Sequence, residues 1–177
     1  DIDTLSNIEK IVSGSGNDTF NLTSTIGIET LDAGAGTDTL ALSGTLDLSN
    51  ITLLNFEKII VEDGETLTLS ARDLDDETYD IELQGTGSLI INATSLSSDH
   101  DFNNITINKT GTATGTVTLI SNNTIDLTSH DINGVNSILD IITVNSGTLT
   151  LSEAQVTDGS VLVNGAGSVI IEVSSSS

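Results

Sequence analysis

The chain repeats itself, and this internal similarity restricts its fold more than any other feature of the sequence. Residues 59–74 read IIVEDGETLTLSARDL, and residues 141–156 read IITVNSGTLTLSEAQV. Residues 83–92 (LQGTGSLIIN) are matched by residues 163–172 (VNGAGSVIIE), in the same order and at an offset of about 80 residues. Repeats of this kind are typical of chains that stack one structural unit on the next. The duplication therefore favours a repetitive architecture over a bulky globular core.

Between the turns, apolar and polar residues alternate, which is the pattern of a half-buried β-strand. In residues 66–70 (TLTLS) the leucines face one way and the threonines the other, and residues 79–84 (YDIELQ) follow the same rule. Further strands are predicted at residues 104–108, 116–120, 138–144, 160–164 and 168–173. The connectors, such as EDGE at residues 62–65, have the composition of turns. We expect an all-β fold.

A short helical turn is expected after several of these strands. Ser or Thr is followed three residues later by Asp or Gln, the spacing of a capping box. The pairs are Ser70/Asp73, Ser98/Asp101, Thr128/Asp131 and Ser152/Gln155. They recur every 24–30 residues, a length that suits one coil of a β-solenoid. We predict a parallel β-solenoid with short helical turns at its corners. Two-residue turns such as Asp63-Gly64 also suit hairpins, so an antiparallel β-sandwich is the alternative.

The charge of the chain limits its partners. There are 26 acidic residues and four basic ones, so the formal net charge is −22. Binding to nucleic acid needs a basic surface, so we expect no nucleic-acid partner. No apolar run approaches the roughly 20 residues of a membrane span, so we expect no membrane insertion. The chain has no cysteine, which excludes disulfides and zinc–thiolate sites. Bound cations would offset the self-repulsion of so acidic a chain.

Two glycine-rich segments carry the pattern of a cation site. Residues 13–20 read SGSGNDTF, and residues 33–40 read AGAGTDTL. Two glycines separated by one residue suit a tight turn, and the aspartate that follows lies where the turn enters a strand. Calcium takes oxygen ligands from carboxylates and backbone carbonyls, which such a loop supplies. The doubled pattern therefore favours calcium over a simple turn cap.

Residues 13–21 and 33–41 resemble the nonapeptide of repeats-in-toxin (RTX) proteins, glycine-glycine-x-glycine-x-aspartate-x-apolar-x, with serine or alanine at its first position. In that family the nonapeptides form a parallel β-roll, and calcium lies between successive turns. The resemblance implies one Ca²⁺ site between the two segments. By motif position, its ligands would be the carbonyls of Ser13, Ser15, Gly34 and Gly36 and the carboxylates of Asp18 and Asp38.

The character of the sequence changes near residue 50. Residues 1–49 are expected to form RTX-like calcium-binding coils, residues 50–173 capped solenoid repeats, and residues 174–177 (SSSS) a flexible tail. The phrase NIEKI at residues 7–11, together with the TLTLS repeats, resembles filler repeats of large surface proteins of Gram-negative bacteria that leave the cell by type I secretion. RTX adhesins and S-layer proteins belong to this group.

These observations predict a structural role. We expect a calcium-stabilised extracellular scaffold of a secreted or cell-surface protein, S-layer-like or adhesin-like, and not an enzyme. We expect self-association or contact with flanking domains of the same chain, and a surface glycan is a further candidate ligand. His100 and His130 both precede an aspartate, and we interpret them as repeat features. The alternatives are a module that binds carbohydrate, ice or a host surface, and an accessory domain of a secreted enzyme.

Overall fold

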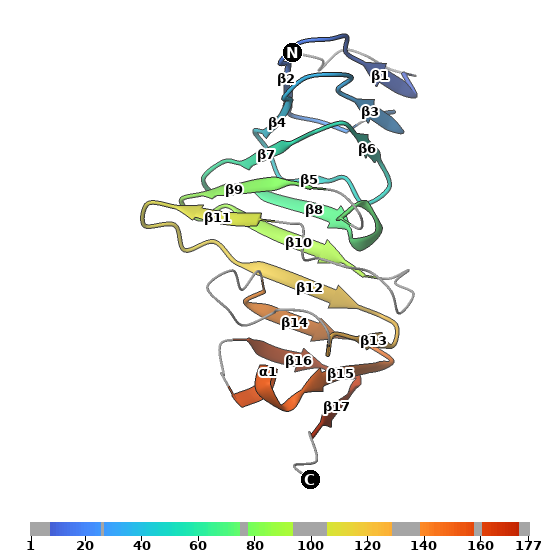
Figure 1. Cartoon of the computed structure of the whole chain (residues 1–177), viewed down its shortest axis with the longest axis vertical. Helices are drawn as coiled ribbons and strands as arrows, with labels where there is room; N and C mark the ends of the chain where they lie inside the picture. The colour runs from blue at the N-terminus through green and yellow to red at the C-terminus, as the bar shows by residue number, and fades with distance from the viewer. Residues whose placement is uncertain are drawn as a thin grey trace.

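Parallel strands dominate the fold. The computed structural model describes residues 8–25, 27–74, 78–93, 106–128, 139–157 and 161–173. Within these ranges every strand pair is parallel, and neighbouring strands of a sheet come from successive coils of the chain. The coils stack along the long axis of the molecule (Figure 1). The parallel β-solenoid is confirmed, and the antiparallel β-sandwich is wrong.

Four sheets run along the described part of the solenoid. One three-stranded sheet contains β1 (Lys10–Val12), β3 (Thr30–Asp32) and β6 (Thr52–Leu54). The five-stranded sheet contains β2 (Thr19–Leu22), β4 (Thr39–Leu42), β7 (Lys58–Val61), β9 (Asp80–Gln84) and β11 (Thr106–Thr110). The six-stranded sheet contains β5 (Leu46–Asp47), β8 (Thr66–Ser70), β10 (Ser88–Asn92), β12 (Val117–Ser121), β14 (Ile141–Val144) and β16 (Leu162–Gly165). The second three-stranded sheet contains β13 (Ile125–Asp126), β15 (Thr148–Ser152) and β17 (Ser168–Glu172).

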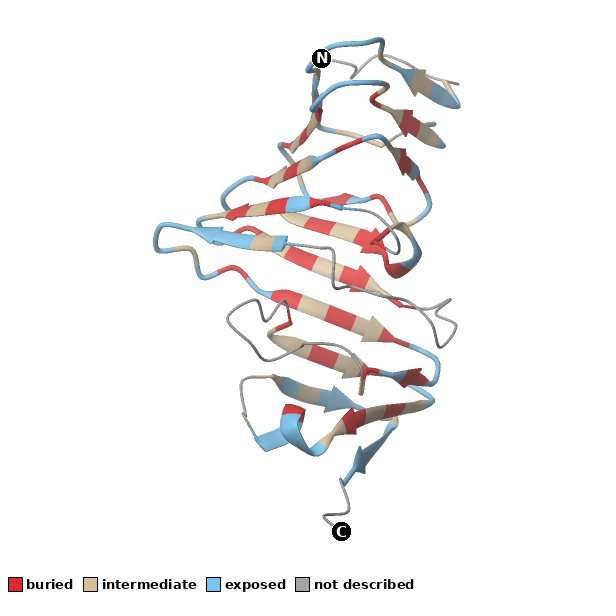
Figure 2. Ribbon diagram, in the orientation of Figure 1, coloured by how far each residue is buried: buried red, intermediate tan, exposed pale blue. Residues whose placement is uncertain are grey.

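Thin layers of aliphatic side chains fill the interior. Along β8 Leu67 and Leu69 are buried, whereas Thr66 and Thr68, which alternate with them, are half-buried, as the alternation predicts. Leu67 lies opposite Leu89 of the next coil, and Leu89 lies opposite Val117 of the coil after that. Figure 2 shows this buried stripe continuing through the central strands. Each fully buried side chain of this size contributes about 1.5–3 kcal/mol, so the stacked rows hold successive coils together.

Helical turns follow β8 and β15, as predicted. Ser152 and Gln155 form a capping box at α1 (Glu153–Thr157): the Ser152 amide donates to Gln155 Oε1 at 2.8 Å, and the Gln155 amide donates to Ser152 Oγ at 3.4 Å. At η1 (Ala71–Leu74) the Ser70 hydroxyl accepts from the Arg72 amide at 3.2 Å, one residue earlier than predicted, because this turn is a tighter 3₁₀ helix. The pair Ser98/Asp101 and the partner of Thr128 lie outside the described residues.

The two copies of the duplicated sequence lie on different faces of the solenoid. β7 and β8 belong to the five-stranded and six-stranded sheets, whereas their counterparts β14 and β15 belong to the six-stranded and second three-stranded sheets. The same shift applies to β9 and β10 and their counterparts β16 and β17. The duplication therefore advances the chain by one face, and similar sequences acquire different neighbours.

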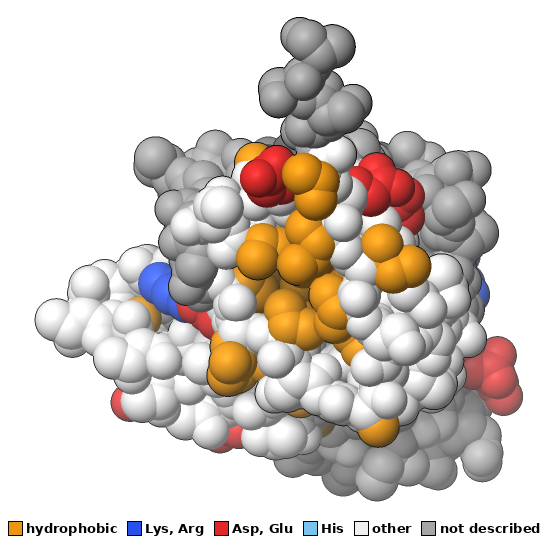
Figure 3. Space-filling model, turned by 90° about the horizontal axis from the view of Figure 1, so that it is seen from below, with side chains coloured by type: hydrophobic (Ala, Val, Ile, Leu, Met, Phe, Trp, Pro, Cys, Tyr) orange, Lys and Arg blue, Asp and Glu red, His pale blue; other side chains and the backbone are white. Residues whose placement is uncertain are grey.

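The sheets are continuous across the predicted boundary at residue 49, because β3 pairs with β6 and β4 pairs with β7. At the other end, the last described coil exposes apolar side chains, including Leu162 (60%) and Val173 (69%). Figure 3 shows hydrophobic side chains gathered on this end face, with acidic side chains near its edge. The described residues include no helix with the length and apolar character needed to cross a membrane.

Candidate metal centre

The two glycine-rich segments stack directly on each other. The first glycine loop (residues 13–18) joins β1 to β2, and the second glycine loop (residues 33–38) joins β3 to β4. The Ala35 amide donates to the Gly14 carbonyl at 3.1 Å, and the Gly16 amide donates to the Ala35 carbonyl at 2.7 Å. A Cβ atom at Gly34, where φ is +88°, would lie 2.1 Å from the Gly14 carbonyl oxygen. Only glycine permits this approach of the two backbones.

The two aspartates at the ends of these loops lie in adjacent coils. Thr19 pairs with Thr39, so Asp18 and Asp38 occupy equivalent positions. Asp38 Oδ1 accepts from the Asp18 amide at 2.7 Å, and the Asp18 carboxylate accepts from the Ser13 hydroxyl. Asp38 is fully buried, and its Oδ2 atom has no hydrogen-bond partner among the described residues. A buried carboxylate oxygen without a partner is costly, and a cation would satisfy it.

The loop carbonyls fit the same role. In the described structure, the hydrogen bonds between the loops use the carbonyls of Gly14 and Ala35. The carbonyls of the four predicted ligands Ser13, Ser15, Gly34 and Gly36 accept none of the backbone hydrogen bonds around these loops in the described structure. All six residues predicted as calcium ligands therefore lie in one pair of stacked loops, and their free oxygens are of the kind that calcium prefers.

Glu57 is a third acid at this corner, and the sequence interpretation missed it. Thr39 pairs with Lys58, so Glu57 occupies the position of Asp38 in the next coil. Glu57 Oε2 accepts from the Asp38 amide at 2.6 Å, which repeats the bond between Asp38 and Asp18. The available signal was an acid directly before a strand, at positions 18, 38 and 57. We call these three residues, Asp18, Asp38 and Glu57, the acidic corner. They place acidic side chains at the same position in three successive coils.

Asp32 lies at the other end of the second glycine loop, and protein groups already offset the negative charge of its carboxylate. Its Oδ1 accepts from Asn55 Nδ2 at 2.6 Å and from the Gly34 amide at 3.2 Å, and its Oδ2 lies 3.3 Å from Lys10 Nζ. The hydrogen bond from Asn55 lowers the pKa of Asp32, and Lys10 and the Gly34 amide act in the same direction. The charge near Asp32 is therefore balanced by protein groups, in contrast to the charge on Asp38.

The other acidic segments do not form a comparable site. In residues 62–65, Asp63 Oδ1 accepts from the amide and the hydroxyl of Thr86 at 2.8 and 3.0 Å. Nowhere in the described ranges do three His, Cys, Asp or Glu side chains converge as a metal cluster. A cation at the glycine loops would therefore depend on backbone carbonyls as well as carboxylates. His100 and His130 lie outside the described residues.

Comparison with known proteins adds no relative, since no protein-family model, no curated protein and no solved structure matches the chain.

Proposed function

We propose that the chain is a calcium-stabilised extracellular scaffold segment of a secreted or cell-surface protein, with a structural and not a catalytic role. The observation that supports this proposal best is Asp38: its carboxylate is fully buried, and one of its oxygens has no partner among the described residues. Calcium at this position would bridge the two glycine loops through Asp18, Asp38 and the free loop carbonyls. Because those loops belong to adjacent coils, the ion would fasten the coils to each other.

The charge of the chain supports an external location for this role. A net charge of −22 opposes compaction, and calcium concentrations outside cells are high enough to fill weak sites. The chain would thus be less stable before export and more stable after it. The resemblance of residues 13–21 and 33–41 to RTX nonapeptides agrees with such a protein, S-layer-like or adhesin-like. Its partners would be flanking domains of the same chain or neighbouring copies.

Limited proteolysis tests the scaffold directly. The chain is digested in 5 mM calcium, in 5 mM magnesium and in chelator, and the rate of loss of the intact band is compared (these concentrations are about those that fill weak extracellular calcium sites). We expect slow digestion in calcium and faster digestion in both other conditions, because magnesium rarely accepts a cage of protein carbonyls. Equal rates in calcium and chelator would contradict the proposed function.

A further inference from the structure

A groove lies at the corner where three strands of the five-stranded sheet begin. It has a volume of about 490 Å³ and is lined by residues 55–57, residues 78–80, Thr106 and Asn108. These segments precede or open β7, β9 and β11, which are neighbours because Lys58 pairs with Asp80 and Asp80 pairs with Thr106. Cavities of about 300–1,000 Å³ are typical of sites for small molecules. The groove lies beside the acidic corner, with Glu57 belonging to both.

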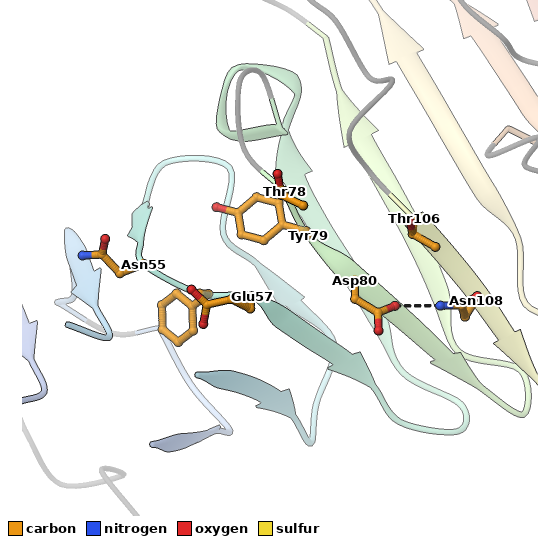
Figure 4. A pocket seen from close by; sticks show the side chains of 8 residues that line it. Asn55, Glu57, Thr78, Tyr79, Asp80, Thr106 and Asn108 are labelled. Carbon is orange, nitrogen blue, oxygen red and sulfur yellow. Dashed lines mark hydrogen bonds between the residues drawn. The ribbon is translucent and has the colours of Figure 1, made fainter. Parts of the chain in front are cut away.

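The groove has a polar rim and an apolar floor. Six exposed polar side chains form the rim: Asn55, Glu57, Thr78, Asp80, Thr106 and Asn108. Phe56 and Tyr79 are 2% and 1% exposed and form the floor. Figure 4 shows these side chains along the groove, with Asn55 at one end and the hydrogen-bonded pair Asp80 and Asn108 at the other. None of the eight lining residues is basic.

Hydrogen bonds hold the rim in place while leaving oxygen atoms for a ligand. Asn108 Nδ2 donates to Asp80 Oδ1 at 2.6 Å, and Glu57 Oε2 accepts from the Asp38 amide at 2.6 Å. A carboxylate has two oxygens, so each of these acids retains a second acceptor. The backbone of Asn55 is left-handed, with φ of +59°. Its side-chain Nδ2 donates to Asp32 Oδ1. Residues held in such conformations cluster at ligand sites.

We propose that this groove binds a neutral sugar residue of a glycan. Adjacent sugar hydroxyls would donate to the carboxylates of Glu57 and Asp80 and accept from the side-chain amide of Asn108. The two carboxylates and the absence of basic lining residues disfavour phosphate groups and acidic sugars. This inference goes beyond the scaffold role and does not depend on calcium at Asp38.

Tyr79 makes the test specific, because the chain contains one tyrosine and no tryptophan. Its fluorescence is recorded while the methyl glycosides of glucose, galactose and mannose are added separately, with calcium present throughout. Saturation-transfer NMR on each glycoside provides a second readout that needs no change at Tyr79. We expect saturable binding of at least one glycoside, with a Kd of about 1 mM, and no binding of glucuronic acid.

Variants then locate the site. Asp80→Asn and Asn108→Ala should each weaken binding about tenfold, the equivalent of one lost hydrogen bond. Glu172→Gln changes an exposed acid on β17, outside the groove, and should leave the Kd unchanged. Circular dichroism establishes that each variant is folded.

The proposal is overturned if none of the glycosides binds, if Asp80→Asn and Asn108→Ala bind as the parent does, or if glucuronic acid binds equally well. A response to calcium chloride alone, with none to any glycoside, would assign the groove to a cation and would also overturn it.

Discussion

One corner of the solenoid is built in two ways. In the first two coils, glycine loops of six residues turn the corner and end in Asp18 and Asp38. In the third coil, residues 55–57 make the same turn, and the buried ring of Phe56 fills the space. The glycine-loop version buries one carboxylate oxygen, Asp38 Oδ2, that has no hydrogen-bond partner among the described residues, whereas the version with Phe56 is filled by packing. We therefore expect calcium to stabilise the first version and to leave the second unchanged.

A substitution at Phe56, in the apolar version of the corner, should have the largest effect on the free energy of unfolding. Phe56 is 2% exposed and packs edge-on against Phe20, with ring centroids 5.3 Å apart. Phe56→Ala should lower the free energy of unfolding by about 3–5 kcal/mol, because it leaves a cavity in the core. Urea denaturation should give the same loss in calcium and in chelator. Val12→Ala, at a side chain that is 55% exposed, should change stability by less than about 0.5 kcal/mol. A loss at Phe56 that calcium restores would remove the distinction between the two corners.

A substitution at the close contact between the glycine loops should have the next largest effect on stability. A Cβ atom at Gly34 would meet the Gly14 carbonyl oxygen at 2.1 Å, whereas a Cβ atom at Gly14 would meet nothing within 4 Å. Gly34→Ala should therefore cost about 1–3 kcal/mol through backbone strain, and Gly14→Ala should cost close to nothing. Thermal denaturation of the pair checks this difference. Equal melting temperatures for the two variants would mean that the loops do not stack.

The helical corners provide a smaller effect away from the glycine loops. Ser152→Ala removes one side of the capping box with Gln155 and should cost about 1 kcal/mol. Ser70→Ala should cost about the same or less, because Ser70 accepts a single bond from Arg72 at 3.2 Å. Both losses should be independent of calcium in urea denaturation. Two variants with unchanged stability would show that these caps contribute nothing.

Acid should weaken the fold modestly through Asp32. The pKa of Asp32 is lowered in the folded chain, first by the hydrogen bond from Asn55. Its contribution to stability is therefore present above the unfolded pKa and is lost as pH falls through the folded pKa. Asp73 should have the opposite effect on stability as the pH falls. Burial raises the pKa of Asp73, so its protonation favours the folded state. Melting curves between about pH 5 and pH 3, a window around the ordinary aspartate pKa, should show a shallower loss for Asp32→Asn and a steeper one for Asp73→Asn. Reversed slopes would contradict these assignments.

Local patterns in the sequence predicted the local structure well. The strand at residues 66–70, the capping box of Ser152 and the stacking of the two glycine loops all follow from residue types and short spacings. The sequence did not reveal which face each copy of the duplication occupies, because that depends on the cumulative length of each coil. The groove was missed for the same reason: register between coils brings Asn55, Asp80 and Asn108 together, and no local pattern records it.

Calcium-dependent stability of the parent chain and Asp38→Asn tests the central claim most directly. Asparagine keeps the shape of the side chain but removes the buried charge, so in chelator this variant should be at least as stable as the parent. In calcium the parent should gain about 2.7 kcal/mol at a concentration one hundred times the Kd, which raises its melting temperature, whereas Asp38→Asn should lose most of this gain. Glu62→Gln, at an exposed acid, should retain the gain. A parent chain whose melting temperature is the same in calcium and in chelator would contradict a calcium site at Asp38.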